Sequence, residues 1–395
     1  MVYCSFLIPV FRGERYITEV ITSCLNQNDP DIEVLVSIDS DDDESFNLAK
    51  DFKDPRLKIF RGEGRKGMLG NYQFLIENAQ GQWISIVGQD DGVLPFAVCE
   101  LRRISLENSS HEIVVSRRAY ANWPSSSKPA EKYRFIYPLD LRKCRIKSAS
   151  RFLNMAMSGY REYSEGPQLY TGSFVCRKLI LRIASLQGGN FFIYPIPDVS
   201  SSVSLLSNTS SYIYSPLPLF WIGTSESSTG VAIDALIDAR GSMESEQFLK
   251  ESFLGSGSEE MSSIPGRGVF TSFSWYIFEA YELLRRCEMF RSKLKFLLAL
   301  AALQIENPQQ WREAKRESSL KINDLRDIKF LDGCVVSLLK INLRFFRKMR
   351  SLNRHVTAIW LKLNGRLYLE RQDSGSELTF QGISSKIDLN YSKLR

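Results

Sequence analysis

The sequence predicts an α/β protein, in which helices flank a mixed, mostly parallel, Rossmann-like sheet and a helical C-terminal region follows. Three observations support this prediction. Strand patterns alternate with helix patterns in the first hundred residues, acidic residues follow two of the predicted strands, and the pattern is helical from residue 266 onward. With 395 residues, the chain is long enough for a catalytic domain and a second unit.

The N-terminal elements follow from the spacing of apolar residues. Compact apolar or β-branched runs predict strands, and apolar residues that fall on one face at helical spacing predict helices. The elements expected here are a strand at 4–10, a helix within 12–27, a strand at 32–38, a helix at 46–52, a strand at 57–60, a helix at 71–80 and a strand at 83–87. A Gly-rich loop, RGEGRKGMLG, precedes the helix at 71–80.

The pattern continues less regularly after residue 100. The elements expected are a strand at 112–116, a helix within 147–165, a short strand within 167–180, a helix beginning near Asp198 and a strand at 211–223. The composition then divides the chain into a catalytic domain at 1–235, a Ser/Gly-rich linker or mobile loop at 236–265, a helical region at 266–370 and a polar tail at 371–395.

Cysteine and histidine usage excludes several kinds of site. The seven Cys include no C-x-x-C pair, which argues against a zinc ribbon or a redox motif and suits a reducing compartment. The chain has two His, His111 and His355, far apart in sequence, so a His-based metal site or a Ser-His-Asp triad is not expected. No secretory signal or membrane-spanning apolar run is apparent, and we expect a cytoplasmic protein.

Acidic residues stand where two predicted strands end. Asp39 follows the strand at 32–38, and the adjacent pair Asp90 and Asp91 follows the strand at 83–87. In open α/β sheets, ligands bind at the carboxyl ends of the strands. Two acids released from a buried strand are costly unless a cation or ligand meets them. This edge of the sheet is therefore the candidate site.

Three stretches in order carry a family resemblance. FLIPVFRGERYI (6–17), EVLVSIDSDDDES (33–45) and NYQFLIENAQGQWISIVGQDDGVLP (71–95) closely resemble the start of family 2 glycosyltransferases of the GT-A fold. The match covers about residues 4–100, and 165–230 more loosely. The resemblance implies an inverting transferase that uses a nucleotide-diphosphate sugar and Mn²⁺ or Mg²⁺. Gly88 stands where the family often has the first acid of an Asp-x-Asp motif.

The resemblance also implies positions for the donor. Asp90 and Asp91 are expected at the metal, and hard divalent cations do prefer such oxygen ligands. Asp39 matches the position that reads the nucleotide base. The other residues expected on the donor side are Pro9, Val10, Arg12, Glu14, Asp41, Arg65, Lys66, Asn71 and Gln89. Solvated loop charges, and a helix cap for Asn71, are the structural alternatives.

Acceptor-side residues follow from the second half of the match. Asp198 matches the acid that takes the proton from the acceptor hydroxyl, and its place near a helix N-terminus favours an ionised carboxylate. A plain helix cap is the alternative. Gly172 and Ser173 are expected near the acceptor sugar. Trp221 is expected either to stack on a sugar or to pack in the core.

The C-terminal region has a cationic pattern. Residues 333–369 contain eight Lys or Arg and no acid, with apolar residues largely on the opposite helical side. The pattern suits an anionic membrane surface, and ordinary packing against neighbouring helices explains it equally well. Nucleic acid binding is not expected, and the pattern does not predict an oligomeric state.

We therefore expect an inverting glycosyltransferase that acts on a hydroxyl of a glycan or lipid-linked acceptor, with a UDP-sugar favoured as donor. The resemblance places it in bacterial surface polysaccharide synthesis, and the cationic C-terminal pattern is compatible with a peripheral position on the inner face of the membrane. Two alternatives remain at this point, which are a catalytically silent sugar- or nucleotide-binding scaffold and a nucleotidyltransferase.

Overall fold

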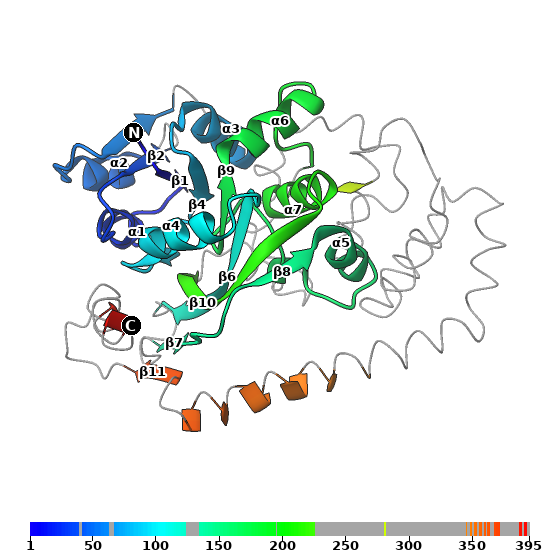
Figure 1. The fold of residues 1–395 in the computed structure, drawn as a ribbon. Coiled ribbons are helices and arrows are strands. Elements are labelled where there is room, and N and C mark those ends of the chain that lie inside the picture. The colour runs from blue at the N-terminus through cyan, green and yellow to red at the C-terminus, as the bar shows by residue number, and fades with distance from the viewer. Residues whose placement is uncertain are drawn as a thin grey trace, which may run out of the picture.

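A computed structural model describes the N-terminal part of the chain almost continuously (Figure 1). The described residues are 1–38, 42–62, 67–123, 134–194, 196–225, 280–281, 345, 348–349, 351–353, 355–357, 359–360, 362–363, 367–371, 387–388 and 391–392. The predicted linker at 236–265 lies outside them, as does most of the predicted helical region.

The elements of the first hundred residues alternate as the sequence predicts up to residue 86, whereas the short strand and the helix that follow were not predicted. The elements are β1 (Cys4–Val10), α1 (Ile17–Leu25), β2 (Ile32–Ile38), α2 (Asp43–Lys50), β3 (Leu57–Arg61), α3 (Gly67–Asn78), β4 (Trp83–Ile86), β5 (Gly92–Val93) and α4 (Ala97–Glu107). All seven residues of β2 are buried, because helices cover both faces of the sheet, and this explains its continuous apolar run.

The later elements include several that the sequence did not predict. They are β6 (Ile113–Asn122), β7 (Arg134–Pro138), β8 (Arg145–Ser148), α5 (Ala149–Met157), the 3₁₀ turn η1 (Tyr163–Glu165), β9 (Ser173–Cys176), α6 (Arg177–Leu186), α7 (Pro197–Ser207), β10 (Ser211–Thr224) and β11 (Leu367–Arg371). β7, β8, α6 and β11 are the additions. β11 lies within residues predicted as helical and polar, and it is a strand that pairs antiparallel with β7.

The sheet is mixed, with a parallel part that contains its first four long strands. The order is β11-β7-β6-β9-β4-β1-β2-β3, and β10 pairs with β5, β6 and β8. β3, β2, β1 and β4 are parallel, and β9 then runs antiparallel between β4 and β6. The predicted fold class, a mostly parallel mixed sheet flanked by helices, is confirmed.

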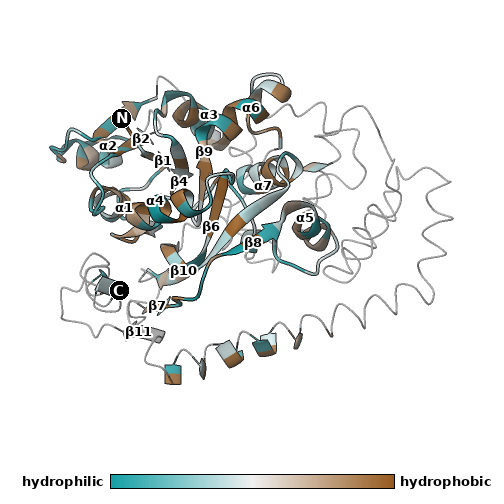
Figure 2. Cartoon of the chain, in the orientation of Figure 1, coloured by the Kyte–Doolittle hydropathy of each residue, from teal (hydrophilic) through white to brown (hydrophobic). Residues whose placement is uncertain are grey.

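Two apolar cores lie on opposite faces of this sheet, and Figure 2 shows the apolar residues concentrated on the central strands. One core joins the sheet to α1, α2 and α4 and contains Phe6 and Ile8. The other joins it to α3, α5, α6 and α7 and contains Leu7. Successive residues of β1 thus enter different cores, as the alternation of side chains along a strand requires.

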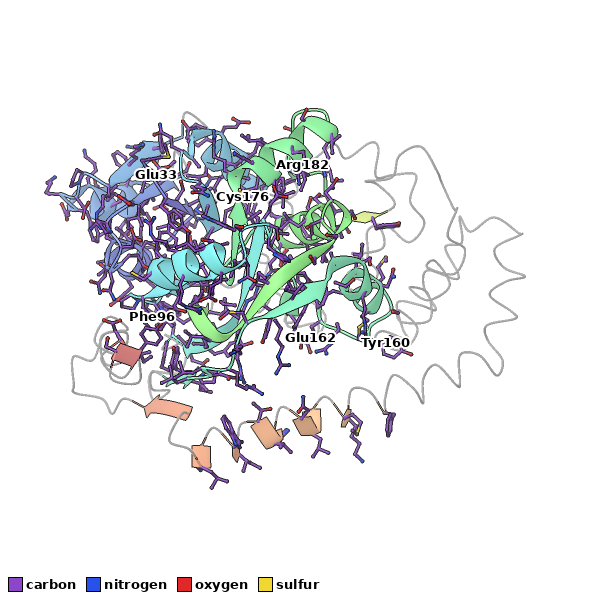
Figure 3. All side chains as sticks on the ribbon, viewed as in Figure 1. Glu33, Phe96, Tyr160, Glu162, Cys176 and Arg182 are labelled. Atoms are coloured by element: carbon purple, nitrogen blue, oxygen red, sulfur yellow. The ribbon has the colours of Figure 1, made fainter. Side chains whose placement is uncertain are left out.

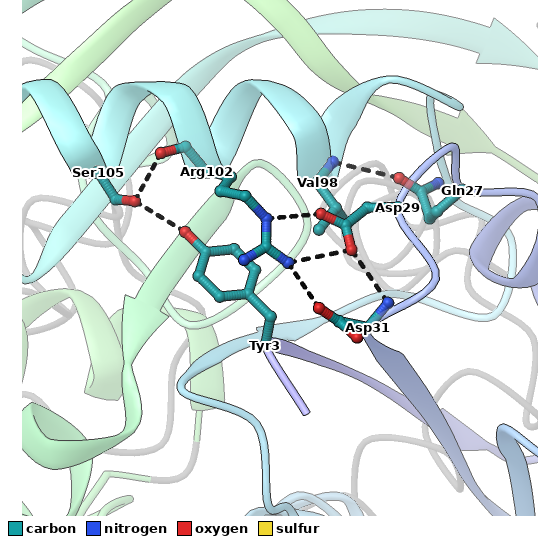
Figure 4. Close-up of polar contacts among 7 residues, drawn as sticks. All are labelled: Tyr3, Gln27, Asp29, Asp31, Val98, Arg102 and Ser105. Atoms are coloured by element: carbon teal, nitrogen blue, oxygen red, sulfur yellow. Dashed lines mark hydrogen bonds and ion pairs between the residues drawn. The ribbon is translucent and has the colours of Figure 1, made fainter. Parts of the chain in front are cut away.

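A polar cluster fastens α4 to the connection between α1 and β2 (Figure 4). The Arg102 guanidinium donates to Asp29 at 2.7 Å and to Asp31 at 3.1 Å, and it lies 3.9 Å from the centroid of the Tyr3 ring. The hydrogen bond from Arg102 lowers the pKa of Asp29. Because α4 follows the loop that contains Asp90 and Asp91, this cluster fixes the far end of that segment.

Candidate active site

The loop between β4 and β5 places Asp91 in the interior. Its side chain is 2% exposed, and each carboxylate oxygen accepts a hydrogen bond. The Thr171 hydroxyl donates to Oδ2 at 2.5 Å, and the Gly223 N–H donates to Oδ1 at 2.8 Å. Asp91 therefore ties its loop to the segment before β9 and to the end of β10.

Asp90 is the more accessible member of the pair. The Ser225 hydroxyl donates to its Oδ2 at 2.7 Å, and the Trp123 indole donates to its backbone carbonyl at 2.8 Å. A Cβ at Gly223 would lie 1.7 Å from that carbonyl oxygen, so only glycine fits where β10 passes the loop. Strands β6 and β10 thus fix the Asp90 backbone from two sides.

The charge of Asp90 disfavours the charged form of Asp91. Burial, followed by the charge of Asp90, raises the pKa of Asp91 to about 7, while the bonds from Thr171 and Gly223 oppose the shift. A divalent cation beside the pair would favour both charged forms. The donor set fits such a cation through Asp90, an oxygen ligand that is partly accessible, whereas both oxygens of Asp91 are already hydrogen-bonded.

Asp198 stands in the first turn of α7, as predicted. The Tyr163 hydroxyl donates to its Oδ2, and the Val199 N–H donates to its Oδ1 at 3.0 Å. Burial raises the pKa of Asp198, and this effect exceeds the lowering by Tyr163, by the backbone N–H groups and by Arg118. The helix N-terminus therefore does not set the charge of this group on its own, and burial has the larger effect.

The three acids lie near the same two tyrosine side chains. Burial raises the pKa of Tyr72, and the charges of Asp198, Asp91 and Asp90 raise it further. Burial also raises the pKa of Tyr170, with contributions from the same three acids. Because charges act on a titrating group only over short distances, Asp90, Asp91 and Asp198 lie in one region.

Gly88, which stands at the position of the missing first acid, is closely packed. A Cβ at this residue would lie 2.4 Å from the Tyr170 hydroxyl oxygen and 2.6 Å from Oδ2 of Asp91. The hydroxyl of Tyr170 therefore takes up space that a side chain at residue 88 would need. At the position where the family often has an acid, this protein therefore has the neutral phenol of Tyr170 beside Asp91.

Three residues predicted to contact the donor hold the backbone around the site. Gln89 bonds the end of β1 in both directions, because its Oε1 accepts from the Phe11 N–H at 2.9 Å and its Nε2 donates to the Phe11 carbonyl at 3.2 Å. The Arg12 N–H donates to Asp42 at 2.8 Å, and Arg12 has a φ of 51°, a region that non-glycine residues rarely adopt. Asn71 lies inside α3 and donates to the Ser37 carbonyl at 3.2 Å, so it does not cap that helix.

The remaining donor-side predictions divide into two groups. Pro9 and Val10 end β1, and Glu14 lies in the turn before α1. All three are therefore close in sequence to Phe11, whose backbone is hydrogen-bonded to Gln89. The predicted contacts of Asp39, Asp41, Arg65 and Lys66 fall outside the described residues and stay predictions.

Gly172, Ser173 and Trp221, which were predicted on the acceptor side, are all buried. Gly172 has a φ of +114°, and a Cβ there would lie 2.5 Å from Nε of Arg118. Ser173 is fully buried on β9, and within the described part of the chain its hydroxyl has no hydrogen-bond partner. Trp221 is 1% exposed and packs against Gly92 and Trp123, a placement that favours the core interpretation.

Sequence reasoning missed residues that contact the three acids or lie near them. They are Tyr72, Arg118, Trp123, Tyr163, Tyr170, Thr171, Gly223 and Ser225. Thr171 and Tyr170 directly precede Gly172, and Gly223 and Ser225 follow Trp221 closely, so their neighbourhood was a usable signal. No signal in the sequence indicated Arg118 or Tyr163. Among the described residues, no group of three or more His, Cys, Asp or Glu side chains could hold a metal.

Comparison with known proteins supports one family. The family model described as "Glycosyl transferase family 2" matches residues 5–165. A Haemophilus influenzae protein named "Uncharacterized glycosyltransferase" is 33% identical over 89 residues, which are 22% of this chain and 36% of that protein.

Two relatives have more specific names. The Campylobacter jejuni "GalNAc(5)-diNAcBac-PP-undecaprenol beta-1,3-glucosyltransferase" is 33% identical over 112 residues, 27% of this chain and 36% of that protein. The Escherichia coli "UDP-Glc:alpha-D-GlcNAc-diphosphoundecaprenol beta-1,3-glucosyltransferase WfgD" is 30% identical over 87 residues, 22% of this chain and 34% of that protein. The chain thus spans about a third of the length of these relatives.

Among solved structures, residues 1–349 of Staphylococcus aureus TarS in complex with UDP-GlcNAc have a TM-score of 0.45 at 14% identity, covering 80% of this chain and 90% of that chain. The family match covers β1 through η1 and includes Asp90 and Asp91. Residues 5–165 are therefore similar to glycosyltransferase family 2, and the mixed, mostly parallel sheet flanked by helices is the fold class that the sequence predicts.

Proposed function

We propose that the protein transfers a sugar, with inversion, from a nucleotide-diphosphate donor to a hydroxyl of a glycan or lipid-linked acceptor. A UDP-sugar is the favoured donor, and bacterial surface polysaccharide synthesis is the expected setting. The names of the Campylobacter and Escherichia relatives, which include undecaprenol-linked acceptors and UDP-Glc, support this choice. The observation that carries the proposal is the convergence of Asp90, Asp91 and Asp198 around Tyr72 and Tyr170.

In this proposal, Asp198 is the catalytic base. Its carboxylate takes the proton of the acceptor hydroxyl as that oxygen forms a bond to the anomeric carbon, and the bond from this carbon to the donor phosphate breaks. A single displacement of this kind inverts the anomeric configuration. Tyr163 and the Val199 N–H hold the carboxylate in place, and removal of water on substrate binding would strengthen its basicity.

Asp90 is the residue best placed to hold Mn²⁺ or Mg²⁺, and Asp91 would support it from the interior. When bound, the cation would neutralise charge on the diphosphate of the donor. The chain contributes the orientation of Asp90 through Ser225 and Trp123, and the shape of the loop through Asp91 and Thr171. Pro9, Val10, Asp39 and Asp41 would line the nucleotide, and Arg65 and Lys66 would approach the phosphates.

A thermal-shift screen of nucleotide-sugars, with and without Mn²⁺, tests the donor class. Ligands that bind only the folded protein raise its melting temperature in proportion to the logarithm of their concentration above the dissociation constant. We expect one UDP-sugar to stabilise the protein, and Mn²⁺ to increase the shift. Stabilisation by nucleoside triphosphates in place of nucleotide-sugars would favour a nucleotidyltransferase. Donor binding without transfer to any acceptor would favour a silent scaffold.

We also propose that the C-terminal region docks on an anionic lipid surface at the inner face of the membrane. Phe345, Met349, Leu352, Val356, Ile359, Trp360 and Leu363 are all large, apolar and exposed, and they recur at helical spacing of three and four residues. The acid-free window at 333–369 carries more positive charge than the whole chain, whose net charge is +6. Such charge complements anionic lipid and opposes pairing with a second copy. No helix among the described residues is long and apolar enough to cross a bilayer.

Sedimentation with phosphatidylglycerol-containing vesicles tests this docking. The variant Val356→Glu with Ile359→Glu places acids on the apolar stripe, whereas Ser351→Glu with Thr357→Glu adds the same charge away from it. We expect the first pair to reduce vesicle binding at least tenfold and the second to reduce it far less. Equal loss for both pairs, or concentration-dependent dimers of the unmodified protein without vesicle binding, would contradict the proposal.

A further inference from the structure

Arg118 of β6 lies against the backbone that follows Tyr170 and Thr171. A Cβ at Gly172 would be 2.5 Å from its Nε and 3.3 Å from its Cζ, so the glycine makes room for the guanidinium. Gly172 also has a φ of +114°, which side-chain-bearing residues rarely adopt. Both the φ of Gly172 and the room that Arg118 needs thus require a glycine at this position.

The guanidinium lies near both acidic parts of the site. It packs against Gly172, which directly follows Thr171, and the Thr171 hydroxyl donates to Asp91. Burial raises the pKa of Asp198, and the positive charge of Arg118 opposes that increase. The same charge opposes the increase that burial causes in the pKa of Tyr163. Arg118 is therefore close to both the candidate metal side and the candidate base.

Within the described part of the chain, the half-buried guanidinium of Arg118 takes part in no hydrogen bond or ion pair. Its neighbour Arg117 provides the contrast, because it faces Asp140 at 3.6 Å. An arginine that is half withdrawn from water loses hydration, and without a hydrogen-bond partner this loss is only partly compensated by nearby negative charge. An anion that arrives with the substrate would supply the missing partner.

The chemistry of the group points to phosphate. A guanidinium presents a planar fork of N–H donors that matches two oxygens of a phosphate or carboxylate, and it keeps its charge at any physiological pH. The carboxylates of Asp91 and Asp198 are near but not in ion-pair contact with it. Both substrates in the proposed reaction can bring phosphate, since the donor carries a diphosphate and a lipid-linked acceptor carries one as well.

We propose that Arg118 binds a phosphate oxygen of a substrate beside Asp91 and Asp198. The inference rests on the proposed function and specifies a binding residue within that site. If the phosphate is the donor's, Arg118 also stabilises the negative charge that the phosphate gains as its bond to the anomeric carbon breaks. If it is the acceptor's, Arg118 selects phosphate-bearing acceptors and positions their hydroxyl near Asp198.

Binding measurements on Arg118→Gln and Arg118→Lys test this proposal. Arg117→Gln is the matched control, since it removes the same charge from the adjacent residue of the same strand. Dissociation constants for UDP, UMP and pyrophosphate are measured by calorimetry with Mn²⁺ and with EDTA, and steady-state transfer is measured with acceptors that carry or lack a phosphate. Arg118→Lys keeps the charge, so it remains informative if Arg118→Gln does not fold.

If Arg118 binds the donor phosphate, Arg118→Gln should bind UDP and pyrophosphate at least about tenfold more weakly than the unmodified protein. The loss of affinity for UMP should be smaller. Arg117→Gln should bind these ligands as tightly as the unmodified protein does. If Arg118 binds the acceptor phosphate, Arg118→Gln should bind UDP as the unmodified protein does, and its KM should rise only for the acceptor that carries a phosphate. Either result supports the proposal. The proposal would be overturned if Arg118→Gln and the unmodified protein had the same affinity for every phosphate ligand and the same KM for each acceptor. If the unmodified protein binds no nucleotide at all, the proposed function fails, whatever Arg118 does.

Discussion

At the residue scale, the environment of Asp198 decides whether it can act as a base. Burial raises the pKa of its carboxyl above that of an ordinary Asp, which is about 4, and the Tyr163 hydrogen bond limits the increase. A base works only when deprotonated, so a raised pKa moves the loss of activity in acid to higher pH.

The acid limb of the pH profile should therefore depend on Tyr163. Tyr163→Phe removes a hydrogen bond that favours the carboxylate, so the pKa of Asp198 rises further and kcat/KM should fall off at a higher pH than in the unmodified protein. Tyr120→Phe, a change at an exposed tyrosine on β6, should leave the limb in place. A limb that stays fixed or moves to lower pH in Tyr163→Phe would contradict this assignment.

Gly88 provides a second test at this scale. The Cβ of Gly88→Ala would contact the Tyr170 hydroxyl and Asp91, and we expect it to lower the free energy of unfolding by about 1–3 kcal/mol, as overpacking does. Because Tyr170→Phe removes the oxygen that the Cβ would meet, the double variant should recover part of the loss. Chemical denaturation of the two single variants and the double variant measures the coupling. Strictly additive losses would show that the two residues do not compete for the same space.

At the scale of elements, the order of strands and helices up to β4 could be predicted because it depends on local spacing. The apolar runs of β1 and β2 are continuous since each strand is covered on both faces. By contrast, β8 and β11 depend on strands remote in sequence, β10 and β7, and their own residues show no alternation that distinguishes them. Asp90, Asp91 and Asp198 could be predicted from their places after a strand and in a helix start. Arg118 and Tyr163 could not, because only the packing of β6 and η1 brings them to the acids.

The contacts around Asp91 determine how firmly its loop is held. The Thr171 hydroxyl donates to Asp91 and accepts from the Gly88 N–H at 3.0 Å, so Thr171→Val leaves two buried polar groups without this partner. We expect a loss of about 2–3 kcal/mol in the free energy of unfolding, together with weaker Mn²⁺-dependent binding of UDP. Thr22→Val, at a solvent-facing helix position, is the control and should cost less than about 0.5 kcal/mol. Similar losses for the two variants would argue against a role of Thr171 in holding the loop.

At the scale of the whole molecule, the C-terminal residues belong to the body of the domain. β11 extends the sheet at β7, and Ile387 and Tyr391 join the core on the side of α4. Tyr391 stacks on Phe96 with ring centroids 4.1 Å apart, and its hydroxyl donates to Glu100. Figure 3 shows Phe96 on the side of the domain that faces these C-terminal residues. The sequence predicts a polar tail at 371–395, and the burial of Ile387 and Tyr391, two of its described residues, was not apparent because they are isolated among polar ones.

Tyr391→Ala should therefore destabilise the domain although it lies far from the site. Loss of a buried aromatic side chain costs about 3 kcal/mol, and Tyr391→Phe, which removes only the hydroxyl, should cost about 1 kcal/mol. Thermal or chemical unfolding of both variants measures these costs, while UDP binding at low temperature should be unchanged. A melting temperature of Tyr391→Ala equal to that of the unmodified protein would show that these residues do not support the domain.

The proposed mechanism requires Asp198 and Asp90 to act on one substrate complex, Asp198 at the acceptor hydroxyl and Asp90 at the cation. The most direct measurement compares donor binding with sugar transfer in Asp198→Asn and Asp90→Asn. We predict that Asp198→Asn binds the UDP-sugar with Mn²⁺ as tightly as the unmodified protein and loses about 10²–10⁴-fold in kcat, whereas Asp90→Asn loses the Mn²⁺-dependent part of donor binding. Undiminished transfer by Asp198→Asn, or Mn²⁺-dependent donor binding that survives in Asp90→Asn, would contradict it.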